Sequence, residues 1–106
     1  MKDDLPPFAG NTYEVTYGEL VAINAYAADT CKLRYEITAG PLKGNSAEVE
    51  YQWRSIDGET FVISWQENDK ATVVHLDNFS REASEAFFTT SDLQFFRMQG
   101  KVRLKA

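Results

Sequence analysis

Hydrophobic and polar residues alternate with a period of two along most of the chain, which is the pattern of half-buried β-strands. Helical periodicity is almost absent. Together with the turn residues between the alternating runs, this pattern predicts about eight strands. They are Thr12–Tyr17, Leu20–Tyr26, Cys31–Thr38, Ala47–Arg54, Thr60–Gln66, Ala71–Leu76, 82–90, and a last strand made of Leu93–Met98 and Lys101–Leu104.

Turn and breaker residues refine this picture. The pair Asp57-Gly58 predicts a tight hairpin between the two central strands. Residues 1–9 are predicted to form an extended lead-in, because their prolines disfavour helix. The first half of residues 82–90 favours helix and the second half favours strand, and we predict strand. The last strand is predicted to bend at Gly100, where a β-bulge fits.

Consecutive strands joined by short turns form an antiparallel meander, and about eight strands are enough to close such a sheet into a small barrel. We therefore predict an all-β fold, an eight-stranded antiparallel up-and-down barrel, in a single domain over residues 1–106. A length of 106 residues leaves no room for two well-packed cores. An open barrel of five or six strands is the alternative.

Composition excludes several classes of partner. The formal net charge is −5 and the basic residues are scattered, so we expect no binding to nucleic acid or to an anionic membrane surface. Apolar runs are too short to cross a membrane. The acidic N-terminus does not resemble a signal peptide, so a cytoplasmic location is expected. The lone Cys31 rules out an internal disulfide and is predicted to be a small buried hydrophobe.

The sequence offers little for metal, cofactor or nucleophilic chemistry. A zinc site needs more nitrogen or sulfur ligands than His75 and Cys31 supply, and no acidic loop has calcium-site spacing, so no metal is expected. A glycine-rich phosphate loop and a Gly-x-Ser-x-Gly motif are also missing, and no cofactor is expected. His75 would serve as a general base only with a carboxylate partner such as Glu36 or Asp77. A histidine with a purely structural role is commoner.

Aromatic side chains are the stronger candidates for a binding site. They alternate on one face of the first strand and of the central hairpin, at Tyr13, Tyr17, Tyr51, Trp53, Phe61 and Trp65. Alternating aromatics usually form core, but buried indoles and phenols also need hydrogen-bond partners, which a partly polar ligand cavity would supply. The opposite face of the third strand carries Arg34 and Glu36, which would grip a polar ligand if that face pointed inward.

The stretch Leu33-Arg34-Tyr35-Glu36-Ile37-Thr38-Ala39-Gly40-Pro41-Leu42-Lys43-Gly44, followed by Phe61-Val62-Ile63-Ser64-Trp65-Gln66-Glu67, resembles the MoaF-like domains. These are relatives of molybdenum cofactor biosynthesis protein F. The resemblance spans roughly residues 10–88 and implies a calycin or lipocalin-like barrel. It brings no reaction with it.

A more distant resemblance is to the bacterial phenolic acid decarboxylases, whose members use a Tyr-x-Tyr pair, an arginine on the third strand and a glutamate near the central turn. Here the first strand keeps only Tyr17 of the tyrosine pair, and Glu36 replaces the arginine. Asp57 or Glu59 is the nearest match to the glutamate. The resemblance therefore implies the fold more than the reaction, since the cation that would hold an anionic substrate is lost.

The sequence favours a non-catalytic barrel that binds a small aromatic or hydrophobic ligand. The predicted ligand-binding residues are Tyr17, Arg34, Glu36, Trp53, Trp65 and His75. One alternative is a small lyase or isomerase acting on an aromatic or phenolic acid, with Tyr17 and Glu36 transferring protons. The other is an interaction module with a filled core that forms a homodimer.

Overall fold

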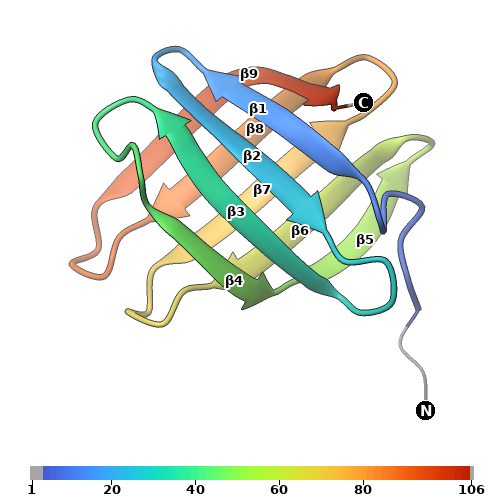
Figure 1. The fold of residues 1–106 in the computed structure, drawn as a ribbon, viewed down its shortest axis with the longest axis horizontal. Helices are drawn as coiled ribbons and strands as arrows, with labels where there is room; N and C mark the ends of the chain where they lie inside the picture. The colour runs from blue at the N-terminus through green and yellow to red at the C-terminus, as the bar shows by residue number, and fades with distance from the viewer. Residues whose placement is uncertain (1–3, 106) are drawn as a thin grey trace.

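The structure, a computed structural model, describes residues 4–105, and these form nine strands and no α-helix (Figure 1). Within this part of the chain there is accordingly no helix long and apolar enough to span a membrane. The strands are β1 (Thr12–Tyr17), β2 (Leu20–Tyr26), β3 (Lys32–Ala39), β4 (Ser46–Glu50), β5 (Gln52–Asp57), β6 (Thr60–Gln66), β7 (Thr72–Asn78), β8 (Ala83–Thr89) and β9 (Phe95–Leu104).

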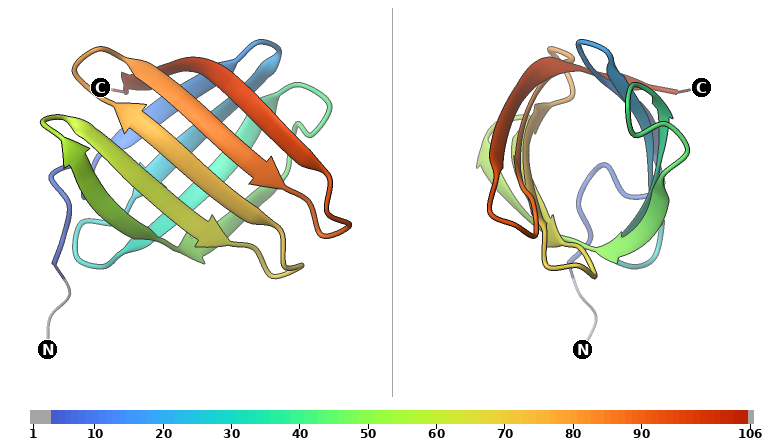
Figure 2. Two further views of the ribbon diagram at one scale, coloured as in Figure 1. Left: turned by 180° about the vertical axis from the view of Figure 1, so that it is seen from behind. Right: turned by 90° about the vertical axis from the view of Figure 1, so that its left-hand side faces the viewer.

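All the strands belong to one antiparallel sheet with the order β4-β3-β2-β1-β9-β8-β7-β6-β5. Neighbours in this order are also neighbours in the chain, except that β1 pairs with β9. The two edge strands, β4 and β5, are consecutive in the chain, so the sheet curls round until its edges meet. Viewed along its length, it forms a ring (Figure 2). The predicted all-β up-and-down barrel class is confirmed.

The strand count differs from the prediction because the predicted strand Ala47–Arg54 is divided. Tyr51 lies between β4 and β5, with its side chain buried and its amide nitrogen donating to the Cys31 carbonyl. On one side of Tyr51 the chain pairs with β3, and on the other side it pairs with β6. The alternation of inward and outward residues was therefore predicted correctly. The single alternating segment forms two strands, one paired with β3 and the other with β6.

Two further predictions concern the second half of the chain. Residues 82–90 do contain a strand, β8, as predicted. The bulge predicted at Gly100 is wrong, because β9 pairs with β8 in unbroken register through Ser84↔Gly100. The irregularities lie instead between Val21 and Ala22 and between Ser55 and Asp57. Gly100 has a different role, which is a close approach to β1.

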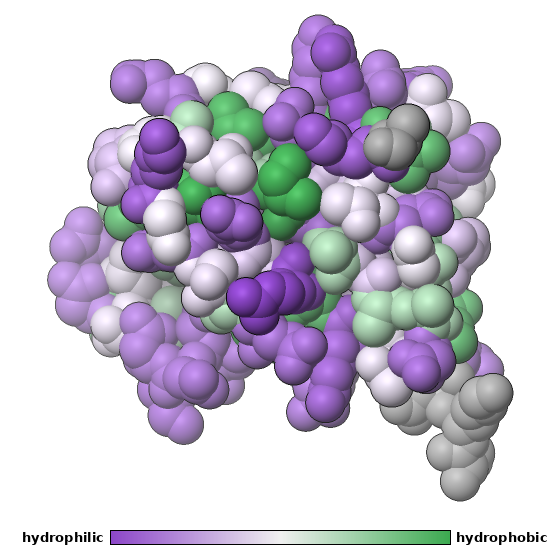
Figure 3. All heavy atoms as spheres, viewed as in Figure 1, coloured by the Kyte–Doolittle hydropathy of each residue, from purple (hydrophilic) through white to green (hydrophobic). Residues whose placement is uncertain are grey.

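The alternation also decides which face of the sheet is inside. Leu33 on β3 is completely buried, whereas its neighbours Arg34 and Glu36 are exposed. The idea that the polar face of β3 points inward is therefore wrong. Burying two charges away from water costs more free energy than the interior could return, so the apolar face turns inward. On the face of the molecule shown in Figure 3, hydrophilic residues predominate and apolar patches lie between them.

One end of the barrel is filled with aromatic side chains. The segment before β1 is not extended as predicted, because residues 6–11 form turns that carry Phe8 into the interior, and residues 1–3 lie outside the described part. The ring of Phe8 lies 4.8 Å from that of Tyr26, 5.4 Å from Phe61 and 5.2 Å from Phe79. This N-terminal segment lies across the far end in the right-hand view of Figure 2.

Candidate functional site

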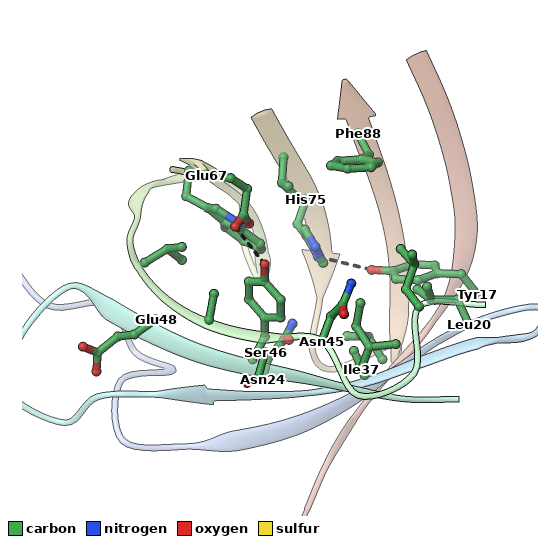
Figure 4. A pocket seen from close by; sticks show the side chains of 18 of the residues that line it. Tyr17, Leu20, Asn24, Ile37, Asn45, Ser46, Glu48, Glu67, His75 and Phe88 are labelled. Atoms are coloured by element: carbon green, nitrogen blue, oxygen red, sulfur yellow. Dashed lines mark hydrogen bonds between the residues drawn. The ribbon is translucent and has the colours of Figure 1, made fainter. Parts of the chain in front are cut away.

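The other end of the barrel holds a cavity of about 410 Å³ (Figure 4). It lies between the last residues of β1, β3, β6 and β8 and the first residues of β2, β4 and β7, opposite the aromatic end. The lining residues are Val15, Tyr17, Leu20, Ala22, Asn24, Tyr35, Ile37, Leu42, Asn45, Ser46, Ala47, Glu48, Val49, Trp65, Glu67, Asn68, Asp69, Val73, His75, Phe88 and Met98.

Aromatic rings that contact one another in a row form a continuous wall of this cavity. The rings of Tyr35 and Trp65 stack with centroids 6.3 Å apart, and Trp65 stacks in turn on His75 at 5.2 Å. Tyr17 meets His75 edge-on at 6.0 Å. These four residues come from four different strands. Each strand carries one of them at an inward-facing position near this end of the barrel. A wall of this kind offers flat ligands a stacking surface.

Glu67 closes the wall near the mouth. Its two carboxylate oxygens accept hydrogen bonds from the hydroxyl of Tyr35 at 2.8 Å and from the indole nitrogen of Trp65 at 2.7 Å. Burial and the hydrogen bond to Glu67 raise the pKa of Tyr35, so its hydroxyl remains a donor. The carboxylate thus fixes both rings in position, and Glu67 is itself one of the residues that line the cavity (Figure 4).

A closed hydrogen-bonded network lies behind His75. The Ser84 hydroxyl donates to Asp77 Oδ1 at 2.5 Å, and the Tyr17 hydroxyl lies 2.5 Å from Ser84 Oγ and 3.2 Å from His75 Nδ1. His75 Nδ1 also lies 3.4 Å from Asp77 Oδ2. All four side chains are buried, and that of Asp77 is completely so. Ser84 supplies a donor to Oδ1 of this buried carboxylate, whereas Oδ2 accepts no hydrogen bond from residues 4–105 and has only the nearby His75 ring beside it.

Counting protons in this network fixes the tautomer of the neutral imidazole. Since Ser84 donates to Asp77, Tyr17 donates to Ser84, and the remaining donor is His75 Nδ1–H, directed at the Tyr17 hydroxyl. A neutral imidazole with its proton on Nδ1 has an unprotonated Nε2. That Nε2 has no hydrogen-bond partner among residues 4–105, and His75 lines the cavity. The network therefore presents a ring nitrogen with a lone pair to the cavity.

A second unpartnered polar group lies elsewhere in the cavity lining. Asn24 is only 3% exposed, and its side-chain amide makes no hydrogen bond to any residue between 4 and 105. It occupies an inward position on β2, between Ala22 and Tyr26, where an apolar residue would be expected. The amide lines the cavity and is not among the fully enclosed polar atoms that lack a partner in the described part of the chain, which are the hydroxyls of Tyr26 and Tyr51 and Oδ2 of Asp77. A molecule in the cavity can therefore hydrogen-bond to Asn24.

Comparison with known proteins agrees with this architecture. The model of the MoaF-like family matches residues 9–103. The chain belongs to the MoaF-like family. The match confirms the resemblance found in the sequence. This MoaF-like chain is also similar to a crystal structure from Burkholderia vietnamiensis, described as that of a "putative beta-lactamase", with 48% identity and a TM-score of 0.95 over 97% of this chain and 100% of that one. No protein with a curated description matches.

The MoaF-like barrel brings together three of the six predicted site residues. Tyr17, Trp65 and His75 line the cavity. The other three lie elsewhere: Arg34 and Glu36 are on the outer face, and Trp53 is at the aromatic end, with its ring 6.2 Å from that of Phe8. A proton-transfer role for Glu36 inside the barrel is therefore excluded by its position.

Of the two carboxylates named as a partner of His75, Asp77 does lie beside it and Glu36 does not. Sequence reasoning missed three other residues that shape the site, of which Ser84 fell in the segment of mixed helix and strand propensity. Glu67 was assigned to a turn. Asn24 carried a usable signal, because a polar side chain at the inward position of a strand is uncommon unless it has a partner.

The buried phenols of this MoaF-like barrel make its stability depend on alkaline pH. Burial, and then the charge of Asp77, raise the pKa of both Tyr17 and Tyr26 above the ordinary value of 10.0. A phenol whose pKa is raised on folding contributes stability below pH 10 that is lost as the pH rises toward its folded pKa. We therefore expect the free energy of unfolding to fall above pH 10, by up to about 1.4 kcal/mol per pH unit for each phenol.

Urea unfolding at pH 8, 10 and 11 measures this loss. The Tyr17→Phe variant is the matched control, because it removes one of the four phenols whose pKa is raised on folding and should lower the pH slope by that phenol's share. A wild-type slope that Tyr17→Phe leaves unchanged would contradict the assignment.

Proposed function

We propose that the protein binds a small, flat organic molecule without negative charge in the cavity of the barrel. The observation that carries the proposal is the pair of unpartnered polar groups, the amide of Asn24 and Nε2 of His75, beside an aromatic wall. A ligand that hydrogen-bonds both groups while stacking on the wall would satisfy every feature of the lining. The cavity volume of about 410 Å³ falls in the usual range for small-molecule sites.

The charge of the lining argues against an anionic ligand. Glu48, Glu67 and Asp69 stand among the lining residues, whereas no lysine or arginine does. A carboxylate ligand would lose its hydration without gaining a cation, at a cost of several kcal/mol. This disfavours the aromatic or phenolic acid considered from the sequence. An interaction module with a filled core is disfavoured by the cavity itself.

The description of the Burkholderia relative raises β-lactam hydrolysis as a second function, which we do not propose for this chain. Serine enzymes of that class use a Ser-x-x-Lys motif, and this sequence has none. Residues 4–105 also contain no group of three or more His, Cys, Asp or Glu side chains placed to hold a metal ion. Ser84 is buried and bonded to Asp77 and Tyr17 instead of to the imidazole, so it is not an activated nucleophile.

Calorimetric titration with 2-naphthol and with 2-naphthoate at pH 7 tests the proposal. The two probes share a ring system and differ in charge. We expect 2-naphthol to bind and 2-naphthoate to bind at least about tenfold more weakly, which corresponds to about 1.4 kcal/mol. Asn24→Leu should weaken 2-naphthol binding by a similar factor, since it removes one hydrogen-bonding group at nearly constant size.

The matched control is Arg34→Ala, which changes a charge on the outer face and should leave both affinities unchanged. Failure of 2-naphthol to bind, or tighter binding of the naphthoate, would contradict the proposed ligand class.

A further inference from the structure

We propose that His75 is a general base that removes a proton from carbon next to the carbonyl group of a small, flat, uncharged ketone. This activity rests on the proposed function, because the ketone is the ligand that the cavity binds. It follows from the same two unpartnered groups, since one has a lone pair and the other can donate a hydrogen bond. Those are the two elements that enolisation requires.

The base is built into the network behind His75. The Tyr17 hydroxyl accepts from Nδ1 at 3.2 Å and so holds the tautomer that leaves Nε2 unprotonated, and the Asp77 carboxylate, 3.4 Å from Nδ1, favours a proton there by its charge. Trp65 stacks on the imidazole with an interplanar angle of 28° and limits its rotation. Asp77 does not reach the cavity lining, so it is a positioning residue. This division of labour, a buried carboxylate that orients a histidine whose other nitrogen meets the substrate, is a general solution to base catalysis.

Asn24 supplies the second element. Its side-chain N–H can donate to the carbonyl oxygen of a bound ketone, on which negative charge develops as the proton leaves. Because Asn24 is 3% exposed, this hydrogen bond forms away from bulk water, where it is stronger. The lack of lysine and arginine in the lining is consistent with a neutral substrate.

The reaction step balances without any further reagent. The carbon–hydrogen bond next to the carbonyl breaks and its proton goes to Nε2 of His75. The electron pair of that bond forms a carbon–carbon double bond, and the carbonyl π pair moves to the oxygen held by Asn24. Return of a proton from Nε2 to carbon regenerates the ketone, and return to a different carbon isomerises an unsaturated one. In D₂O the imidazole exchanges its proton with solvent, so the ketone acquires deuterium.

Proton NMR of 2-indanone in D₂O measures this exchange, and a parallel calorimetric titration measures its binding. The wild-type protein should bind 2-indanone and accelerate loss of its methylene signals over buffer, and excess 2-naphthol should suppress the acceleration. His75→Gln should lower kcat at least about 100-fold, within the usual range for removal of a general base. Asn24→Leu should lower it by about 100-fold or more. Arg34→Ala, on the outer face, should leave it unchanged.

Asp77→Asn tests the positioning role separately. An amide at this place donates toward Nδ1 and favours the tautomer with its proton on Nε2, which is no longer a base. We expect kcat to fall while KM stays within about twofold and the calorimetric number of 2-indanone sites per chain stays that of the wild type, so that a smaller folded fraction does not account for the fall.

The outcomes separate the two proposals. Wild-type protein that binds 2-indanone without accelerating exchange overturns the base activity and leaves the proposed function standing, whether or not the variants fold. Failure of 2-indanone and 2-naphthol alike to bind overturns both. Exchange that survives in folded His75→Gln shows that another group is the base and also overturns the assignment.

Discussion

Replacing Phe8 with alanine is expected to lower the free energy of unfolding by about 3–5 kcal/mol. Phe8 is only 2% exposed, although it precedes the first strand and belongs to no ladder. Its ring lies at the centre of the aromatic end of the barrel and is close to five of the other rings there. The rings within about 6 Å of it belong to Tyr26, Tyr51, Trp53, Phe61 and Phe79.

The loss is large because the surrounding rings cannot collapse into the vacated space. They are carried by β2, β5, β6 and the segments beside them, whose positions are set by the ladders of the barrel. The penalty therefore combines the lost transfer free energy of a phenyl ring with that of a residual cavity. A domain of this size has a total stability of only about 5–15 kcal/mol, so the substitution removes a large part of it.

Equilibrium urea unfolding of Phe8→Ala against wild type measures the effect. The matched control is Phe95→Ala, which removes the same ring from a side chain that is 53% exposed and should cost less than about 1 kcal/mol. Equal effects at the two positions would show that Phe8 does not fill the barrel end. The cavity at the opposite end should keep its affinity for 2-naphthol in whatever fraction of Phe8→Ala remains folded.

The fold was predictable because period-two alternation reports local geometry directly. Each strand buries one face, and the more apolar face goes inside, as Leu33 against Arg34 illustrates. The alternation does not report which strand is the partner. Tyr51 continues the pattern from β4 into β5 without interruption, although the pairing changes from β3 to β6 at that residue. A change of partner is a long-range event, and local sequence leaves no trace of it.

The candidate site was predictable only in part, for a related reason. Trp53 and Trp65 occupy equivalent inward positions on adjacent strands, and the alternation cannot tell them apart. Their positions along the barrel axis distinguish them, because Trp53 lies beside Phe8 and Trp65 lies beside His75. Phe8 decides which end is filled, and its inward path depends on a turn before β1 that carries no periodic signal. A residue at one end of the barrel therefore determines that the cavity lies at the other end.

Gly100→Ala is expected to cost at least about 3 kcal/mol, more than most substitutions that add a single methyl group. A Cβ atom at this position would lie 1.8 Å from the carbonyl oxygen of Thr16 and 2.8 Å from its carbonyl carbon. These are backbone atoms of β1, which cannot rotate away as the end of a side chain would. The ladder between β1 and β9, which unites the two halves of the sheet, must separate to make room.

Gly18→Ala is the matched control for this glycine. It adds the same methyl group where nothing lies within 4 Å, so its cost should be limited to about 1–2 kcal/mol of backbone strain from a φ of +61°. The same Cβ at Gly100 would also lie 2.9 Å from Cδ1 of Tyr17, which lines the cavity. Gly100→Ala should therefore weaken 2-naphthol binding even in protein that stays folded, and Gly18→Ala should not. If urea unfolding gave the two variants equal stability, β1 and β9 would not approach each other this closely at Gly100.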